Sequence, residues 1–157
     1  MDKNFYITTP IYYPSARPHM GHAYSSIIAD FFSRFKTIDG YKVYFLTGTD
    51  EHGLKIQRSA EKEGLDPLKF CDQISKTFRD LSKTLNLSNK DFIRTTEERH
   101  KKTVQHLWKE LEKNDDIYLS NYSGWYSVSD EAFYNEDEIE EVEGKKISIS
   151  SKSTVEW

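Results

Sequence analysis

Two histidines, His19 and His22, lie at the start of a predicted helix and are separated by Met20 and Gly21. The start of a helix presents unpaired backbone N–H groups and the positive end of the helix dipole, which both favour phosphate groups. Imidazole N–H groups there could donate further hydrogen bonds to phosphate oxygens, and a glycine leaves room for a ribose or a base to approach the backbone. His19, Gly21 and His22 are therefore a candidate nucleotide-binding site.

Two other interpretations of the histidine pair remain open. Four-residue motifs recur by chance, so both side chains could be ordinary helix-capping or surface histidines. A metal site is less favoured, since ligand-type neighbours at zinc spacing are missing and a helix start favours anions. The chain has neither the glycine-rich loop nor the lysine of a P-loop, so ATP would have to bind without them.

A second candidate site lies in the turn at residues 48–53, after a short apolar run. Asp50 could pair its carboxylate with a substrate ammonium group, and partial burial would strengthen that pair. The alternative role of Asp50 is local, as a turn residue or a helix N-cap. A third segment, residues 9–14, is apolar, aromatic and rich in proline. It could line a pocket for an unbranched thioether side chain, and equally it could be core.

The predicted secondary structure places the histidines and Asp50 after strands. Each of three predicted strands is followed by a helical pattern: residues 5–9, 43–46 and 92–93. This order predicts an α/β fold with a Rossmann-like, doubly wound parallel sheet, in which the first strand is buried and the second is covered on both faces. Ligands of such folds bind beyond the carboxyl ends of the strands, where both candidate sites lie.

Two helices are predicted to bury an apolar face, and apolar residues mark a third helix. In the first, at about residues 21–36, helical spacing predicts sheet contacts for Ala23, Ile27, Ile28, Phe31, Phe32 and Phe35. In the second, which opens with Asp66 as the cap and Pro67 as the first helical residue, the predicted buried face is Leu68, Cys71, Ile74, Phe78, Leu81 and Leu85. The third is marked by Val104, Leu107, Trp108 and Leu111. From about Ile117 short aromatic stretches follow, which predict a small β-rich insertion.

The composition limits the classes of protein that the chain can represent. Its 157 residues allow one domain of ordinary size, and the net charge of −4 argues against a basic surface for nucleic acid over the whole chain. The single Cys71 can form neither an intrachain disulfide nor a zinc knuckle of paired cysteines. Neither a secretory signal nor a membrane-spanning stretch is evident, so a cytoplasmic location without membrane contact is expected.

Five motifs in one order along nearly the whole chain together resemble bacterial methionyl-tRNA synthetase, a class I aminoacyl-tRNA synthetase. They are YITTPIYY (6–13), PHMGH (18–22), LTGTDEHG (46–53), DFIRTTEERH (91–100) and GWYSVSDE (124–131). PHMGH alone is typical of the wider superfamily. The resemblance implies that residues 1–116 are the first part of the Rossmann-like catalytic domain and that residues 117–157 begin the connective peptide domain.

The resemblance also implies roles for the candidate residues. ATP would be bound by His19, Gly21 and His22, and the two histidines would be catalytic. Asp50 would contact the amino group of methionine, and the pocket for its side chain would be lined by Pro10, Ile11 and Tyr13. The implied reaction forms methionyl-adenylate from ATP and L-methionine with Mg²⁺ as cofactor, and then transfers methionine to tRNA(Met).

The sequence departs from the family pattern in two places. Many relatives carry a Cys-x-x-Cys knuckle where this chain has Ser127-Val128-Ser129-Asp130, so a structural zinc is not expected. The chain also stops at Trp157, before the Lys-Met-Ser-Lys-Ser loop, the second half of the nucleotide fold and the anticodon-binding domain. We therefore expect the isolated chain to be an inactive fragment.

Two alternative functions remain. Among enzymes, the histidine signature also occurs in other nucleotidyltransferases of the superfamily and in the synthetases for leucine, isoleucine, valine or cysteine, although residues 10–14 and 49–53 favour the methionyl type. In a different class, the chain could be a catalytically inert half-fold that only binds a nucleotide or an amino acid.

Overall fold

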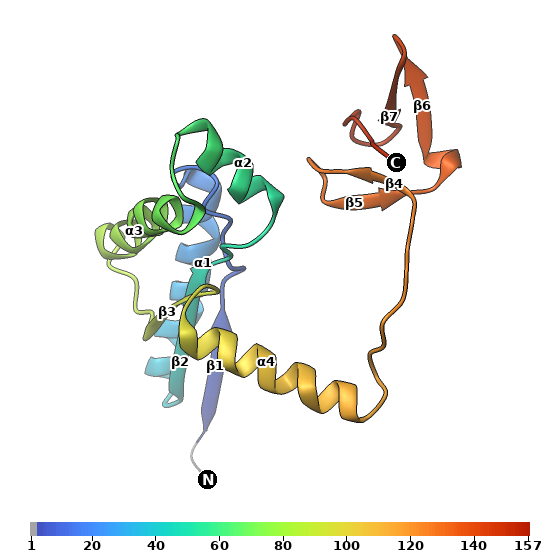
Figure 1. Cartoon of the computed structure of the whole chain (residues 1–157). Coiled ribbons are helices and arrows are strands. Elements are labelled where there is room, and N and C mark those ends of the chain that lie inside the picture. Colours follow the sequence, from blue (N-terminus) through green and yellow to red (C-terminus); the bar gives the residue numbers. More distant parts are fainter. Residues whose placement is uncertain (1–2) are drawn as a thin grey trace. The chain divides into compact units, whose positions relative to one another are not determined.

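The computed structural model describes residues 3–157, which form two compact units (Figure 1). The first unit ends at Leu107 and the second is Trp108–Trp157. The first contains β1 (Asn4–Thr8), α1 (Met20–Ile38), β2 (Lys42–Thr49), α2 (Leu54–Lys62), α3 (Pro67–Thr84), β3 (Asp91–Arg94) and most of α4 (Glu98–Lys113). The second contains β4 (Trp125–Ser127), β5 (Ala132–Tyr134), the 3₁₀ helix η1 (Glu136–Glu138), β6 (Ile139–Val142) and β7 (Lys145–Ser148). The functional domain boundary after residue 116 stays a prediction.

The first unit is built on a three-stranded parallel sheet with the order β1-β2-β3. β1 pairs with β2 along its whole length, and the end of β2 pairs with β3, so that Gly48 lies opposite Ile93 and Thr49 opposite Arg94. Helix α1 connects β1 to β2, and α2 and α3 connect β2 to β3. The predicted Rossmann-like α/β fold is confirmed, and the carboxyl ends of the three strands lie at one edge of the sheet.

Helices α1 and α3 have the boundary signals expected from the sequence. The Asp66 carboxylate caps α3 by accepting hydrogen bonds from the N–H groups of Leu68 (3.0 Å) and Lys69 (3.2 Å), and Pro67 is the first helical residue. α1 is followed by Gly40, whose φ of +80° lies in the left-handed region that favours glycine.

The face of α1 that is buried is not the aromatic face that the periodicity predicted. The buried residues of α1 are Ala23, Ser26, Ala29, Asp30 and Ser33. The other predicted sheet contacts are between 40% and 63% exposed: Ile27, Ile28, Phe31, Phe32 and Phe35. Small side chains let a helix approach its neighbours closely, and the polar ones have partners, since Ser26 bonds to Tyr12 (2.9 Å) and Ser33 to Ser88 (2.9 Å). Of the predicted contacts, only Ala23 is buried.

Two further burial predictions are wrong for the described residues. β1 is an edge strand of this sheet, and its Tyr6 is 62% exposed beside Tyr44 of β2, which is 46% exposed. Leu68 lies in the first turn of α3 and is 51% exposed. The apolar residues that marked the third helix, α4, are largely exposed as well, although no burial was predicted for them: Val104, Leu107 and Trp108. In each case the apolar pattern identified the element correctly but not the side chains that it buries.

The core of the first unit consists of two apolar clusters that share helix α3. The first contains Ile56, Ala60, Phe70 and Cys71, and the second contains Tyr12, Phe78 and Phe92. Ile74 of α3 packs against both. The predicted buried face of α3 is therefore confirmed at Cys71 and Phe78 and in part at Ile74. Burial raises the pKa of the Cys71 thiol to about 11, so this cysteine is an unreactive core residue.

The second unit consists of two antiparallel hairpins, β4-β5 and β6-β7, in agreement with the predicted β-rich segment. Its polar centre includes Ser127 and Asp130, the two ends of the Ser127-Val128-Ser129-Asp130 segment. Ser127 is fully buried, and its hydroxyl accepts a hydrogen bond from the N–H of Asp130 (3.3 Å). Hydrogen bonds from Ser151, Ser153 and Tyr134 lower the pKa of the Asp130 carboxyl to about 2.

Candidate functional site

The two histidines together cap the first turn of α1. His19 is the N-cap residue, and its Nδ1 accepts a hydrogen bond from the backbone N–H of Gly21 (3.0 Å). Nδ1 of His22 accepts a hydrogen bond from the backbone N–H of His19 (3.0 Å). The ring centroids are 3.9 Å apart. This is a capping box in which two imidazoles take the places usually held by a hydroxyl and a carboxamide or carboxylate.

Capping leaves one nitrogen of each ring for a ligand. A ring nitrogen that accepts a hydrogen bond carries no hydrogen, so the tautomer that fits these caps has its hydrogen on Nε2 in both rings. Each Nε2–H is then a donor beside the positive end of the helix. The capping and nucleotide-binding interpretations of the sequence are therefore compatible, because they use different atoms.

Two aromatic rings pack against the ring of His22. The His22 ring centroid lies 4.9 Å from that of Tyr12 and 5.1 Å from that of Phe78, both in edge-to-face geometry. Burial lowers the pKa of His22, and the neighbouring His19 lowers it further. At neutral pH His22 is therefore uncharged, with a single ring N–H to donate.

Gly21 makes room for the ring of His19. A Cβ atom at position 21 would lie 2.9 Å from Cε1 and 3.1 Å from Nδ1 of His19, closer than side chains normally pack. A larger residue would therefore displace the ring from its capping position. That Gly21 also lets a ligand approach the backbone stays a prediction.

Asp50 directly follows β2 and is half-buried. Its N–H donates to the carbonyl of Tyr12 (2.9 Å), and its Oδ1 accepts a long hydrogen bond from the hydroxyl of Thr95 (3.5 Å). The N-cap of α2 is Gly53, so Asp50 does not have the capping role considered from the sequence. A hydrogen bond of this length leaves the carboxylate able to pair with an ammonium group.

The proline-rich segment alternates between core and surface. Tyr12 is 8% exposed and Pro14 is fully buried, whereas Pro10 is exposed and Ile11 and Tyr13 are 42% and 44% exposed. The three residues assigned to a pocket wall are thus those whose side chains are accessible. The core interpretation holds for Tyr12 and Pro14.

Tyr12 connects the two candidate sites, a role that the sequence did not reveal. Its N–H donates to the carbonyl of Gly48 (3.0 Å) and its carbonyl accepts from Asp50, which extends the sheet pairing beyond β1. Its ring contacts His22, and its hydroxyl is hydrogen-bonded to Ser26 of α1 (2.9 Å). The histidine pair and Asp50 therefore belong to one continuous region at the carboxyl ends of β1 and β2.

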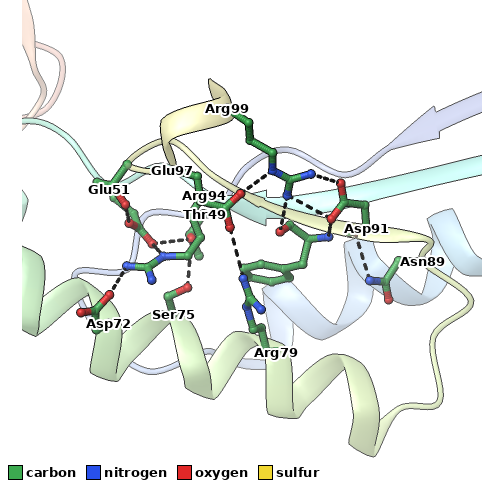
Figure 2. Close-up of polar contacts among 12 residues, drawn as sticks. Thr49, Glu51, Asp72, Ser75, Arg79, Asn89, Asp91, Arg94, Glu97 and Arg99 are labelled. Atoms are coloured by element: carbon green, nitrogen blue, oxygen red, sulfur yellow. Dashed lines mark hydrogen bonds and ion pairs between the residues drawn. The ribbon is translucent and has the colours of Figure 1, made fainter. Parts of the chain in front are cut away.

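A buried carboxylate directly follows Asp50 (Figure 2). The Glu51 side chain has no exposed surface, and its Oε1 accepts hydrogen bonds from the hydroxyl of Thr49 (2.8 Å) and from Nε of Arg94 (2.7 Å). Its Oε2 accepts from the hydroxyl of Thr96. Burial alone would raise the pKa of Glu51, but the hydrogen bonds from Arg94, Thr96 and Thr49 together bring it below its ordinary value. The sequence signal for this cluster was a charged residue, Arg94, next to hydroxyls at the end of an apolar strand.

Metal-ligating side chains are not clustered in the described chain. Among residues 3–157, no three His, Cys, Asp or Glu side chains are placed to hold one ion together. The expected lack of a structural zinc stays a prediction. Of the described helices, none combines the length and apolar character that a bilayer crossing requires.

Comparison with known proteins identifies the family. The profile of the family described as tRNA synthetases class I (M) matches residues 5–154. The chain is 53% identical to a methionine–tRNA ligase of Rickettsia bellii over 88% of its length and 51% identical to one of Listeria monocytogenes over 90%. The chain belongs to the methionyl-tRNA synthetases of class I.

Solved structures of methionyl-tRNA synthetase share this fold. The Mycobacterium tuberculosis enzyme in complex with methionyl-adenylate matches 99% of the chain with a TM-score of 0.93 and 44% identity. A leucyl-tRNA synthetase of Agrobacterium radiobacter, at 22% identity and a TM-score of 0.73, shares the fold alone. The chain spans 27% and 21% of the two bacterial ligases and 30% of the M. tuberculosis chain, so it corresponds to part of a methionyl-tRNA synthetase.

Proposed function

We propose that the protein to which this chain belongs activates L-methionine with ATP and transfers it to tRNA(Met). Family membership supports this proposal, as does the M. tuberculosis relative that binds methionyl-adenylate. The observation that carries it is the junction at Tyr12, where the start of α1, an element end that favours anions, and the carboxylate of Asp50 lie at one edge of the sheet. Such a site suits the joining of an amino acid to a nucleotide.

In the proposed first step, a carboxylate oxygen of methionine attacks the α-phosphorus of ATP. The bond from that phosphorus to the β-bridging oxygen breaks, and pyrophosphate leaves with the electron pair. The methionine carboxylate is already ionised at neutral pH, so this step needs no general base. The protein contributes by positioning the substrates and by stabilising charge on the phosphates.

The candidate residues take separate parts in this step. Nε2–H groups of His19 and His22 donate to phosphate oxygens, and the Asp50 carboxylate pairs with the methionine ammonium group. The thioether side chain contacts Pro10, Ile11 and Tyr13, because soft sulfur packs well against apolar and aromatic groups. We propose that Mg²⁺ binds together with the ATP phosphates and neutralises part of their negative charge.

In the proposed second step, a terminal ribose hydroxyl of tRNA(Met) attacks the carbonyl carbon of the adenylate, and AMP leaves. The tRNA contacts belong to parts of the protein beyond the described residues or to local surfaces of this chain, since the net charge is −4. We also propose that the protein is located in the cytoplasm and that the isolated chain is inactive.

ATP–pyrophosphate exchange in the complete protein tests the first step. We expect methionine-dependent exchange, a fall on the order of 10²- to 10³-fold in rate for His22→Ala, and for Asp50→Ala a rise in the KM for methionine larger than that for ATP. Circular dichroism checks that both variants fold. A wild-type protein without methionine-dependent exchange would refute the function. Unchanged exchange in His22→Ala, or equal KM effects in Asp50→Ala, would remove the role assigned to that residue.

A further inference from the structure

Glu51 cannot itself meet a substrate, because its carboxylate is enclosed. The side chain has no exposed surface, and both oxygens accept hydrogen bonds from Thr49, Arg94 and Thr96. A buried carboxylate is costly unless it is paired and hydrogen-bonded, so its partners are strongly constrained to stay in place. Glu51 nevertheless lies next to the residue that the proposed function assigns to the substrate ammonium group.

Residues 94–96, at the end of β3, are hydrogen-bonded to the turn after β2 at several points. Thr95 is the centre of this contact: its hydroxyl accepts from the N–H of Glu51 (2.8 Å) and donates to Oδ1 of Asp50 (3.5 Å). Its carbonyl lies 3.3 Å from Nε2 of His52, and its N–H donates to the carbonyl of Thr49 (3.2 Å). The residues on either side of Thr95 bind the Glu51 carboxylate, so consecutive residues of one segment hold consecutive residues of the other.

Helix α3 also contacts Arg94 and Thr49. Figure 2 shows Arg94 between two carboxylates, with Nε 2.7 Å from Glu51 and Nη2 2.6 Å from Asp72 of α3. Ser75 of α3 is hydrogen-bonded to Thr49 (3.3 Å). The Nε contact with Glu51 is a directed hydrogen bond, whereas Nη2 meets Asp72 as an ion pair without hydrogen-bond geometry. The position of Glu51 is therefore tied to β3 and to α3 at once.

Asp50 depends on these contacts because its own anchors are weak. Its carboxylate has the long hydrogen bond to Thr95, and its backbone is held by one hydrogen bond to Tyr12. α2 begins after Gly53, which provides no side-chain cap to fix the turn. The neighbouring Glu51, in contrast, is held at its backbone N–H and at both carboxylate oxygens.

We propose that Glu51 is a positioning residue for amino-acid binding: through Arg94, Thr95 and Thr96 it holds the Asp50 carboxylate where it meets the substrate ammonium group. This inference rests on the proposed function. It also gives a role to the Arg94-Thr95-Thr96 part of the fourth sequence motif, which the proposed chemistry leaves unused. A preorganised carboxylate binds an ammonium group more tightly than a mobile one, because no ordering is needed on binding.

The main test compares Glu51→Gln with the wild type in the complete protein, by ATP–pyrophosphate exchange. The amide keeps the shape of the side chain but loses the charge that holds Arg94. We expect the KM for methionine to rise about 10-fold, while the KM for ATP and kcat stay within about 2-fold. A purely structural role would lower the amount of active protein, and hence kcat, without this selective rise in KM; that outcome would overturn the inference.

A methionine analogue without the amino group separates positioning of Asp50 from a general loss of affinity. This desamino analogue keeps the thioether and the carboxylate and is used as a competitive inhibitor. In Glu51→Gln its inhibition constant should match that of the wild type within about 2-fold while the KM for methionine rises. Equal weakening of both ligands would overturn the inference. If the wild-type protein showed no methionine-dependent exchange, the proposed function would fail instead.

Two further variants keep the inference testable if Glu51→Gln folds poorly. Thr95→Val removes the hydroxyl that contacts both Asp50 and Glu51, and Thr95→Ser restores it, so only the valine variant should show the selective rise in KM. The matched control is Arg99→Gln, which breaks the 2.5 Å pair between Arg99 and Asp91 near the same strand without touching the turn (Figure 2). A rise in the methionine KM of the control equal to that of Thr95→Val would contradict the proposal.

Discussion

At the scale of single residues, the candidate site depends on side chains that serve the fold and the ligand with different atoms. Nδ1 of each histidine caps α1, which leaves Nε2 for a phosphate. The Tyr12 ring supports His22, while its carbonyl holds Asp50. Substituting such residues affects folding and binding together, so the most informative changes are those that move one of these groups without removing it.

Gly21→Ala is such a change. The added Cβ displaces the His19 ring, so we expect the rate of ATP–pyrophosphate exchange in the complete protein to fall by up to about 10²-fold. Folding stability should change by less than about 1 kcal/mol, since the higher helix propensity of alanine offsets a lost cap hydrogen bond.

Met20→Ala is the control for Gly21→Ala, because the Met20 side chain is 82% exposed in the same turn. Chemical denaturation and the exchange assay measure the two quantities. A Gly21→Ala protein with wild-type exchange would show that the His19 ring tolerates the methyl group.

At the scale of elements, helical and strand periodicity predicted the order and the boundaries well, because both are local properties of the chain. Periodicity did not predict which neighbour each face meets. The aromatic stripe of α1 has the right spacing and is exposed, while Ser26 and Asp30 are buried because partners from other elements satisfy them. Arg94 and Glu51 are 43 residues apart, and only the parallel register brings them together.

The close approach of β2 and β3 at Gly48 is another feature that no local pattern predicts. A Cβ there would lie 2.0 Å from the carbonyl oxygen of Ile93, so the strands would have to separate. We expect Gly48→Ala to lower the free energy of unfolding by about 1–3 kcal/mol or more, measured by urea denaturation.

The control for Gly48→Ala is Gly124→Ala, where an added Cβ meets no neighbour closer than 3.5 Å. A loss of stability in Gly48→Ala no greater than that in Gly124→Ala would mean that the strands adapt without cost.

At the scale of the whole molecule, acid should destabilise the first unit through its buried carboxylates. The pKa of Glu51 is lowered from 4.5 and that of Asp30 from 3.8; in both, hydrogen bonds outweigh the opposite effect of burial. A lowered native pKa means that the unfolded chain binds more protons near these values. The stabilisation is complete above pH 4.5 and is lost as the pH falls through the native pKa values.

Urea denaturation of this chain between pH 3 and 7 measures how the free energy of unfolding depends on pH. Glu51→Gln removes one titrating group, so the difference in unfolding free energy between the wild type and this variant should shrink below pH 4.5. A difference that stays constant across this range would show that Glu51 titrates alike in the native and unfolded chains.

The position of Tyr12 has a consequence for ligands at the two ends of the site. Tyr12 packs against the ring of His22, and its carbonyl accepts a hydrogen bond from the N–H of Asp50, so we expect a small displacement caused by either ligand to reach the other. If the proposed function holds, we expect the affinities for nucleotide and amino acid to be energetically coupled. Thermodynamic linkage requires the coupling to be reciprocal: the factor by which ATP alters methionine affinity equals the factor by which methionine alters ATP affinity.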